Sequence, residues 1–163
     1  MRTVAVLGPI PRDRIITHRG EVFEKYGCVL YTVAALSALM EPTDRICPIV
    51  HVRKRDEEAI KELLAPMPNV DLTGVRSDND RGDVVELTYQ DQNTRLERQS
   101  GFMSPILPRD VEFALDAEAF VCVPITDYEV GQATLAYIKS HSAGTVLLDA
   151  HGPTSTLVIG GER

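Results

Sequence analysis

One stretch of the sequence decides how the fold is interpreted: Tyr26-Gly27-Cys28-Val29-Leu30-Tyr31-Thr32-Val33-Ala34-Ala35-Leu36-Ser37-Ala38-Leu39. Positions 29–41 contain neither glycine nor proline, which predicts a helix of ordinary length. Because apolar residues fall on every side of this helix, we expect it to be buried all round. A buried helix that begins at Gly27 brings free backbone N–H groups to its start, beside Tyr31 and Thr32, where a polar or anionic ligand can bind. The alternative is a core helix whose glycine only permits a tight turn.

The composition indicates one acidic domain. The chain has 163 residues, 44% of them hydrophobic, and a net charge of −7, which is enough for one core and too little for two domains. An acidic chain without a long basic run is a poor candidate for binding nucleic acid or an anionic membrane. The three widely spaced cysteines lack metal-ligand spacing and are expected to be reduced core thiols. With no secretory signal or spanning segment in the sequence, we expect a cytoplasmic protein.

The N-terminal segment contributes a candidate ligand-binding residue. Thr3-Val4-Ala5-Val6-Leu7 is a continuous apolar run that ends at Gly8, a pattern typical of a strand buried in a parallel sheet. Ligands of open α/β sheets bind at the carboxyl ends of the strands. Asp13 is the first carboxylate beyond this strand and is therefore a candidate site residue. A surface aspartate in a turn is the alternative.

The remaining segments predict alternating strands and helices. Strands are expected at 45–52, 69–75, 119–123 and 145–149, and helices at 55–65 and 108–115. Thr126-Asp127-Tyr128-Glu129 matches a capping box that would begin a further helix. Repeated strand–helix units predict a mostly parallel sheet with helices on both faces.

One segment differs from this pattern. In the segment 82–101, Val85, Leu87 and Tyr89 alternate with polar residues, and a polar second arm follows a turn at 91–93. Such a hairpin has one solvated face, so we expect it to stand off the core. Together with the β-prone segment 13–26, it is predicted to form a lid on a single domain spanning 1–163.

Three features taken in order resemble the N-terminal half of the ribokinase-like (PfkB-type) carbohydrate kinases. Gly8-Pro9-Ile10-Pro11-Arg12-Asp13 is similar to the family's strand-end glycine with a substrate-binding aspartate five residues later. Residues 27–39 resemble the next segment of the family. There a glycine (here Gly27) is followed four residues later by asparagine or tyrosine (here Tyr31) and then by a helix of small residues. Leu148-Asp149-Ala150-His151-Gly152 resembles a strand-end segment of these kinases. The resemblance implies a Rossmann-like three-layer α/β/α fold with a small β lid.

The sequence also departs from the family pattern. Tyr26 stands where the first of two glycines is expected, Met40 where the helix-ending glycine is expected, and Arg53 lies in a segment that usually reads Val-Gly-x-Asp. A larger side chain at a ligand-facing turn would narrow the pocket. The sequence therefore does not decide which sugar or nucleoside would be the substrate. Neither the Gly-Ala-Gly-Asp-type motif that carries the family's catalytic aspartate nor a P-loop occurs in residues 1–163. The chain is therefore expected to be one half of a kinase, inactive by itself.

The implied activity is ATP-dependent phosphorylation of a hydroxymethyl group of a sugar or nucleoside. By resemblance, Asp13 would bind substrate hydroxyls, Gly27 would admit the ring close to the backbone, and Tyr31 would supply a hydroxyl or an apolar face. ATP and Mg²⁺ would be bound mostly by residues outside this chain. No catalytic residue is expected within it, since the family's catalytic motif would lie C-terminal to Arg163. His151 is interpreted as an ordinary loop residue.

Two other functions remain open. A non-catalytic module could bind a small molecule or form a homodimer through the exposed hairpin. A Rossmann-type nucleotide binder is disfavoured, because Gly8 is not followed by the G-x-G-x-x-G spacing.

Overall fold

The predicted apolar runs form a parallel central sheet in the computed structural model, which describes residues 1–161. Its five strands are β1 (Thr3–Leu7), β4 (Arg45–His51), β5 (Val75–Arg76), β8 (Ala119–Cys122) and β9 (Thr145–Leu148). They lie in the order β5-β4-β1-β8-β9, and every neighbouring pair is parallel. The carboxyl ends of β1, β8 and β9 therefore meet at one edge of the sheet.

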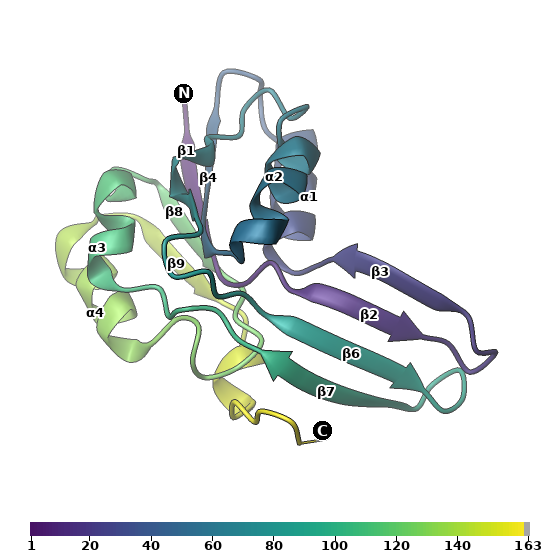
Figure 1. Ribbon diagram of the computed structural model, residues 1–163. Coiled ribbons are helices and arrows are strands. Elements are labelled where there is room, and N and C mark those ends of the chain that lie inside the picture. Colours follow the sequence, from purple (N-terminus) through teal and green to yellow (C-terminus); the bar gives the residue numbers. More distant parts are fainter. Residues whose placement is uncertain (162–163) are drawn as a thin grey trace.

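Helices cover both faces of the central sheet (Figure 1). The helices α1 (Val29–Leu39) and α2 (Lys54–Leu64) lie on one side, and α3 (Pro108–Val111) and α4 (Gln132–His141) on the other. Short 3₁₀ turns occur at Leu72–Gly74, Glu112–Ala114 and Gly152–Thr154. Each face has its own apolar cluster, one around Val33 and Ile60 and the other around Phe120 and Ile138. The predicted three-layer α/β/α fold with a mostly parallel sheet is thus confirmed.

A second sheet projects from the carboxyl edge of the central one (Figure 1). It consists of β2 (Arg12–Ile16), β3 (Val22–Tyr26), β6 (Val84–Tyr89) and β7 (Arg95–Gly101) in the order β3-β2-β6-β7. We call it the outer sheet. Its strands come from the segments 13–26 and 82–101 that were expected to form a lid. β2 and β6 are parallel and the other pairs antiparallel, which joins the two separated segments into one layer.

The expectation that α1 is buried all round is wrong. Val29 and Val33 are buried, whereas Tyr31 is 50% exposed and Leu39 82% exposed. Since α1 lies in an outside layer, only one of its faces contacts the sheet. Its exposed positions include Ala35 and Ala38, and alanine favours helix formation whether or not it is buried. The apolar composition of the helix therefore led us to expect more burial than the structure has.

The strand predicted at 69–75 is also wrong over most of its length. β5, Val75–Arg76, pairs as a strand and Val70 makes a single parallel bridge with Ile46, but Leu72–Gly74 between them form a 3₁₀ turn. The side chain of Asp71 accepts a hydrogen bond from the Thr73 N–H at 2.9 Å. This local bond competes with extended structure and turns the chain.

The predicted capping box does not begin a helix. α4 starts at Gln132, after Glu129. The buried Glu129 carboxylate accepts hydrogen bonds from the N–H groups of Ile125 (3.1 Å) and Thr126 (2.7 Å) and from the Thr126 hydroxyl (2.6 Å). The same residue pair thus closes the loop after β8, because its hydrogen bonds need only a tight turn and not a helix behind it.

No helix within residues 1–161 combines the length and the apolar character that crossing a bilayer requires.

One expectation falls beyond the part of the chain that the structure describes. The catalytic motif was expected C-terminal to Arg163, and Arg163 itself lies outside the described residues 1–161. That expectation stays a prediction, and the site is built below from residues 1–161 alone.

Candidate ligand-binding site

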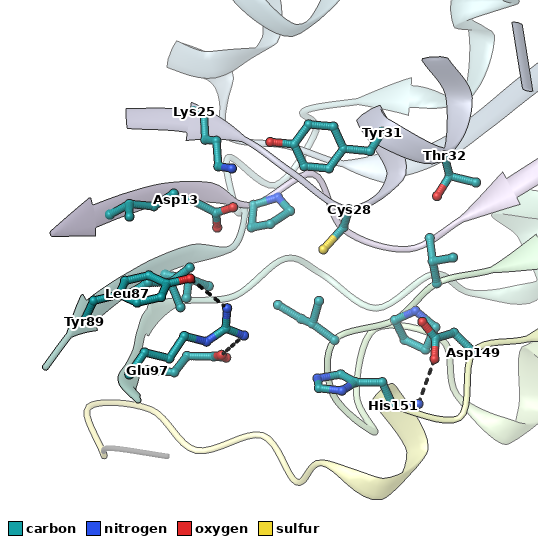
Figure 2. Close-up of a pocket in the computed structure, with 17 residues that line it drawn as sticks. Asp13, Lys25, Cys28, Tyr31, Thr32, Leu87, Tyr89, Glu97, Asp149 and His151 are labelled. Carbon is teal, nitrogen blue, oxygen red and sulfur yellow. Dashed lines mark hydrogen bonds and ion pairs between the residues drawn. The ribbon is translucent and has the colours of Figure 1, made fainter. Parts of the chain in front are cut away.

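A cavity of about 430 Å³ lies between the start of α1, the carboxyl ends of β8 and β9, and the inner face of the outer sheet (Figure 2). Its polar and aromatic lining residues come from all of these elements and include Asp13, Lys25, Cys28, Tyr31, Thr32, Tyr89, Arg95, Glu97, Asp149 and His151. The cavity lies at the carboxyl edge of the central sheet, where ligands of open α/β sheets bind. It is large enough for a small polar molecule.

Asp13 contributes a carboxylate to the inner wall. It lies opposite Lys25 on β3 and Val85 on β6, and strand alternation directs all three side chains to the same face of the outer sheet. Burial raises the pKa of Asp13 to about 6, which Lys25 and Arg95 partly offset. At neutral pH this carboxylate is mostly ionised and accepts hydrogen bonds.

Gly27 lies against Asp13. A β-carbon at residue 27 would stand 2.7 Å from Oδ2 of Asp13 and 3.6 Å from Cε2 of Tyr31. The three residues proposed from the sequence are therefore neighbours. Asp13 on β2 and Tyr31 on α1 line the cavity, and Gly27, just before α1, lies against both. The absence of a side chain at Gly27 makes room for the carboxylate there.

Most of the backbone N–H groups expected to be free at the start of α1 are bonded within the protein. The Val29 N–H donates to the Pro9 carbonyl at 3.1 Å, and the N–H groups of Tyr31 and Thr32 donate to the Cys28 carbonyl at 3.0 and 3.2 Å. These donors are thus satisfied, Val29 by the loop after β1 and the other two within the first turn of α1. Polar recognition in this cavity rests on side chains.

Two unusual backbone positions shape the base of the cavity. Gly8 has φ 146°, and a β-carbon there would lie 2.7 Å from the Val123 carbonyl oxygen. Only glycine fits where β1 ends so close to the segment after β8. Cys28, the residue before α1, has φ 48° and ψ −108°, a conformation that is costly for a residue with a β-carbon.

The outer-sheet wall places cations beside aromatic rings. Arg95 Nη1 donates to the Tyr89 hydroxyl at 3.4 Å, and Arg95 Nη2 lies 3.8 Å from Glu97 Oε2. Lys25 Nζ lies 5.5 Å from the centre of the Tyr31 ring, within the range of a cation–π interaction. The wall therefore offers donors, an acceptor and flat apolar faces together, as a polyhydroxylated ring requires.

Sequence reasoning did not identify Lys25, Arg95 and Glu97. The alternation along the hairpin was the available signal, but it does not say which face turns toward the central sheet. His151, interpreted as an ordinary loop residue, also lines the cavity, and its N–H donates to Asp149 Oδ1 at 2.9 Å. Figure 2 shows both residues opposite Asp13 and Lys25, across the cavity.

Cys28 has little nucleophilic character although it lines the cavity. Burial raises the pKa of its thiol to about 12, with Asp13 as the next contributor. At neutral pH the group is a neutral thiol, which is a poor nucleophile. Cys28, Cys47 and Cys122 are all free cysteines.

Tyr26, which stands where a glycine was expected, does not narrow the cavity. Its hydroxyl donates to Asp56 Oδ1 at 3.0 Å, and Arg53 Nε donates to Asp56 Oδ2 at 2.6 Å. The side chain thus extends from the end of β3 toward α2, and it is absent from the cavity lining. It fastens the outer sheet to the body of the domain.

No family model matches the sequence, and no curated protein matches it. Solved structures do resemble the fold. A pyrophosphate-dependent kinase of the ribokinase family, in a sulfate complex, matches with a TM-score of 0.76 at 18% identity, over 91% of this chain and 50% of that one. Halothermothrix orenii fructokinase matches with a TM-score of 0.69 at 16% identity, over 94% and 60%. Arabidopsis thaliana ribokinase, complexed with ribose and ATP, matches with a TM-score of 0.66 at 16% identity, over 93% and 54%.

These matches confirm the resemblance at the level of the fold. The chain has a ribokinase-like fold and spans about half the length of the pyrophosphate-dependent kinase that it resembles. Identities of this size establish no activity and no substrate, which must be argued from the cavity itself.

Proposed function

We propose that this chain provides the acceptor-binding half of a small-molecule kinase that phosphorylates a hydroxymethyl group of a sugar or nucleoside. The observation that carries the proposal is that Asp13 and Tyr31 line one cavity beneath the outer sheet, with Gly27 packed against both of them. We call it the acceptor cavity. A ribokinase-like fold supports a kinase function in general, because the similar solved structures include a fructokinase, a ribokinase and a myo-inositol kinase.

Acceptor binding would use the side chains of the cavity in distinct roles. The Asp13 carboxylate would accept hydrogen bonds from two neighbouring hydroxyls, and Lys25 and Arg95 would donate to ring or hydroxyl oxygens. The rings of Tyr31 and Tyr89 would contact the apolar face of the acceptor. These contacts would orient one hydroxyl for transfer, which is a major part of the catalysis of phosphoryl transfer.

The outer sheet would act as the lid of this site. Its inner face carries the half-buried Ile15 and Leu87 beside the polar side chains, so closing over an acceptor would bury apolar surface and exclude water. This role is proposed for the segments 13–26 and 82–101.

The donor and its metal ion would have to be held elsewhere. Within residues 1–161 no group of three metal-ligating side chains converges, and the sequence up to Arg163 lacks the glycine-rich aspartate motif and a P-loop. The residues present therefore do not fit an ATP or Mg²⁺ site, and no catalytic step is assigned to either. One kinase of similar fold is pyrophosphate-dependent. The test below therefore uses both ATP and pyrophosphate as phosphoryl donors.

The exposed edge of the central sheet supports pairing with the polypeptide that would hold the donor. β9 is an edge strand, and Leu147 and Leu148 on it are 52% and 41% exposed. An apolar parallel edge strand is unfavourable in water, because parallel sheets are ordinarily covered. We propose that polypeptide carrying the donor site pairs with this edge.

The second candidate function is a non-catalytic homodimeric binding module. Val22 and Phe23 on β3, the edge strand of the outer sheet, are 50% and 54% exposed, which would suit a second copy docking there. An acceptor would still bind in the cavity, but nothing would be phosphorylated.

The test is calorimetric titration of the protein with ribose, fructose, myo-inositol and adenosine, followed by product detection with ATP or pyrophosphate. Saturable binding of a polyol or nucleoside, weakened about tenfold or more in Asp13→Asn, supports the acceptor site. Absence of binding across the panel, with a cooperative melting curve as the folding control, contradicts it. Binding without product when the donor half is supplied favours the module.

A further inference from the structure

A second cavity lies at the base of the outer sheet, on the side away from the acceptor cavity. Its volume is about 480 Å³, and its lining includes Arg53, Arg55, Asp80, Arg81, Ser100 and Phe102. We call it the root cavity. Val84 also lines it, whereas the next residue, Val85, lines the acceptor cavity. Since successive side chains of a strand point to opposite faces, the two cavities are separated by the outer sheet.

The root cavity concentrates positive charge in an acidic protein. Three arginines and one aspartate line it, although the chain as a whole carries a net charge of −7. Of the three, Arg53 is engaged with Asp56, whose Oδ2 accepts from Arg53 Nε at 2.6 Å. Within the part of the chain that the structure describes, Arg55 and Arg81 make no ion pair. Their guanidinium donors are therefore available to a ligand.

Among the described residues 1–161, the aspartate forms no ion pair with these arginines, although its charge offsets one of theirs. Asp80 Oδ1 accepts a hydrogen bond from the Lys54 N–H at 2.6 Å and so caps the start of α2. The helix end thus has its own anionic partner, and attraction of a ligand would rest on the arginines. The Arg81 guanidinium carbon lies 5.7 Å from the centre of the Phe102 ring, an arrangement that holds the cation at the cavity wall.

We propose that the root cavity binds the phosphate group of a small molecule. Guanidinium groups bind phosphate oxygens in a bidentate, charge-assisted manner, Ser100 adds a hydroxyl, and Phe102 provides an apolar surface for the part of the ligand next to the phosphate. A small ligand is favoured over nucleic acid or an anionic membrane, because the arginines line a cavity of limited size on a protein of net negative charge.

The position of the root cavity gives such a ligand a mechanical consequence. Arg53 and Arg55 belong to the start of α2, whereas Arg81 precedes β6 and Ser100 lies at the end of β7. The two parts are already close, because a β-carbon on Gly82 would lie 2.9 Å from the Arg53 backbone nitrogen. A phosphate bound by both parts bridges the body of the domain and the base of the outer sheet. This holds whether or not the acceptor cavity has the function proposed above.

The proposal is tested by calorimetric titration of the purified protein with inorganic phosphate and with phenyl phosphate, at constant ionic strength set with chloride. We expect saturable binding of both, with phenyl phosphate tighter because of Phe102. The double variant Arg55→Gln/Arg81→Gln should raise the dissociation constant at least about tenfold, since it removes two charge-assisted contacts. Both side chains are at the surface, and melting curves verify that the variant folds.

Two matched variants separate this site from other sources of binding. Arg19→Gln removes one positive charge from the β2–β3 turn, and Arg95→Gln removes one from the acceptor cavity; each is matched in charge by the single variants Arg55→Gln and Arg81→Gln, which are titrated beside it. Neither control should change the dissociation constant for phosphate. The proposal is overturned if no saturable binding occurs, if the double variant binds as tightly as the unaltered protein, or if either control weakens binding to the same extent. Stronger binding of oligonucleotides or of phosphatidylserine vesicles, lost in the same double variant, would also overturn the small-molecule assignment.

Discussion

Oδ2 of Asp13 occupies the space beside Gly27 where a side chain would begin: a β-carbon on residue 27 would lie 2.7 Å from that oxygen. This is shorter than any ordinary contact between carbon and oxygen atoms. The carboxylate keeps its position in the cavity only because residue 27 is a glycine. The relationship couples two residues that lie on different elements, and it makes the site sensitive to a single methyl group.

Gly27→Ala should therefore weaken acceptor binding without unfolding the protein. The new methyl group displaces the Asp13 carboxylate, and we expect a dissociation constant at least about tenfold higher, the cost of one charge-assisted hydrogen bond. Calorimetric titration with the acceptor identified in the panel measures it. Gly131→Ala is the matched control, because a β-carbon there meets nothing within 4 Å. Equal affinities for the two variants would contradict the proposed role of the pair.

Asp13→Asn should bind acceptor more weakly and yet unfold less readily at neutral pH. Folding raises the pKa of Asp13 from 3.8 to about 6 through burial, so the folded state holds its proton more tightly than the unfolded chain. Stability is therefore lost as pH rises from about 4 to about 6. The asparagine avoids this loss and should raise the free energy of unfolding by about 1–2 kcal/mol at pH 7, after allowance for solvent screening.

The comparison that checks this stability effect is a pair of urea unfolding curves at pH 7 and at pH 4. At pH 4 the aspartate is protonated in the folded state, so the variant and the unaltered protein should differ little. A gain in stability of the same size at both pH values would attribute the effect to packing and not to the buried charge.

Acceptor affinity should decline as the pH falls through about 6. Protonated Asp13 has lost one of its hydrogen-bond acceptor positions. With a pKa of about 6, only about a tenth of the molecules carry the carboxylate at pH 5. The apparent dissociation constant should therefore rise roughly tenfold between pH 7 and pH 5. Titration calorimetry across this range measures it. His151 and Asp149 also face the cavity, so Asp13→Asn is the control that must flatten the profile. A profile that persists in that variant assigns the effect to another group.

A homodimer formed through the outer sheet should dissociate when its exposed edge becomes charged. Phe23 on β3 is 54% exposed, and Phe23→Glu would place a carboxylate inside such an interface. Analytical ultracentrifugation should then show a dimer for the unaltered protein and a monomer for the variant. Leu39→Glu, at an 82% exposed position at the end of α1, should leave the dimer intact. A monomer before any substitution would eliminate this interface.

Residues 1–163 should not catalyse phosphoryl transfer by themselves. They lack the glycine-rich aspartate motif, which was expected C-terminal to Arg163, and the loss of such groups reduces rates by orders of magnitude. The check is product formation from ATP or pyrophosphate with any acceptor that binds. Turnover at rates of ordinary kinases, abolished by a substitution within this chain, would show that the chain carries its own catalytic groups.

Much of the central fold was predictable from short-range patterns. The continuous apolar runs at 3–7 and 45–52 can be buried only between two layers, so a parallel sheet with helices on both faces followed from them. Asp13 was identifiable for the same reason, since its place after β1 put it at the ligand-binding edge. Patterns failed where one sequence fits two structures: the Thr126–Glu129 pair forms a loop in place of a helix cap, and the alanines of α1 are consistent with burial or exposure.

The sequence by itself determined the layers of the central sheet, the outer position of the segments around β2 and β6, and the candidates Asp13, Gly27 and Tyr31. Only the tertiary structure decided that these three residues meet, that Lys25 and Arg95 face them, and that Arg55 and Arg81 share a cavity on the opposite side of the outer sheet. The physical reason is that alternation along a strand defines two faces but not their surroundings. Which face covers a ligand depends on contacts between residues far apart in the chain, such as the pairing of β2 with β6.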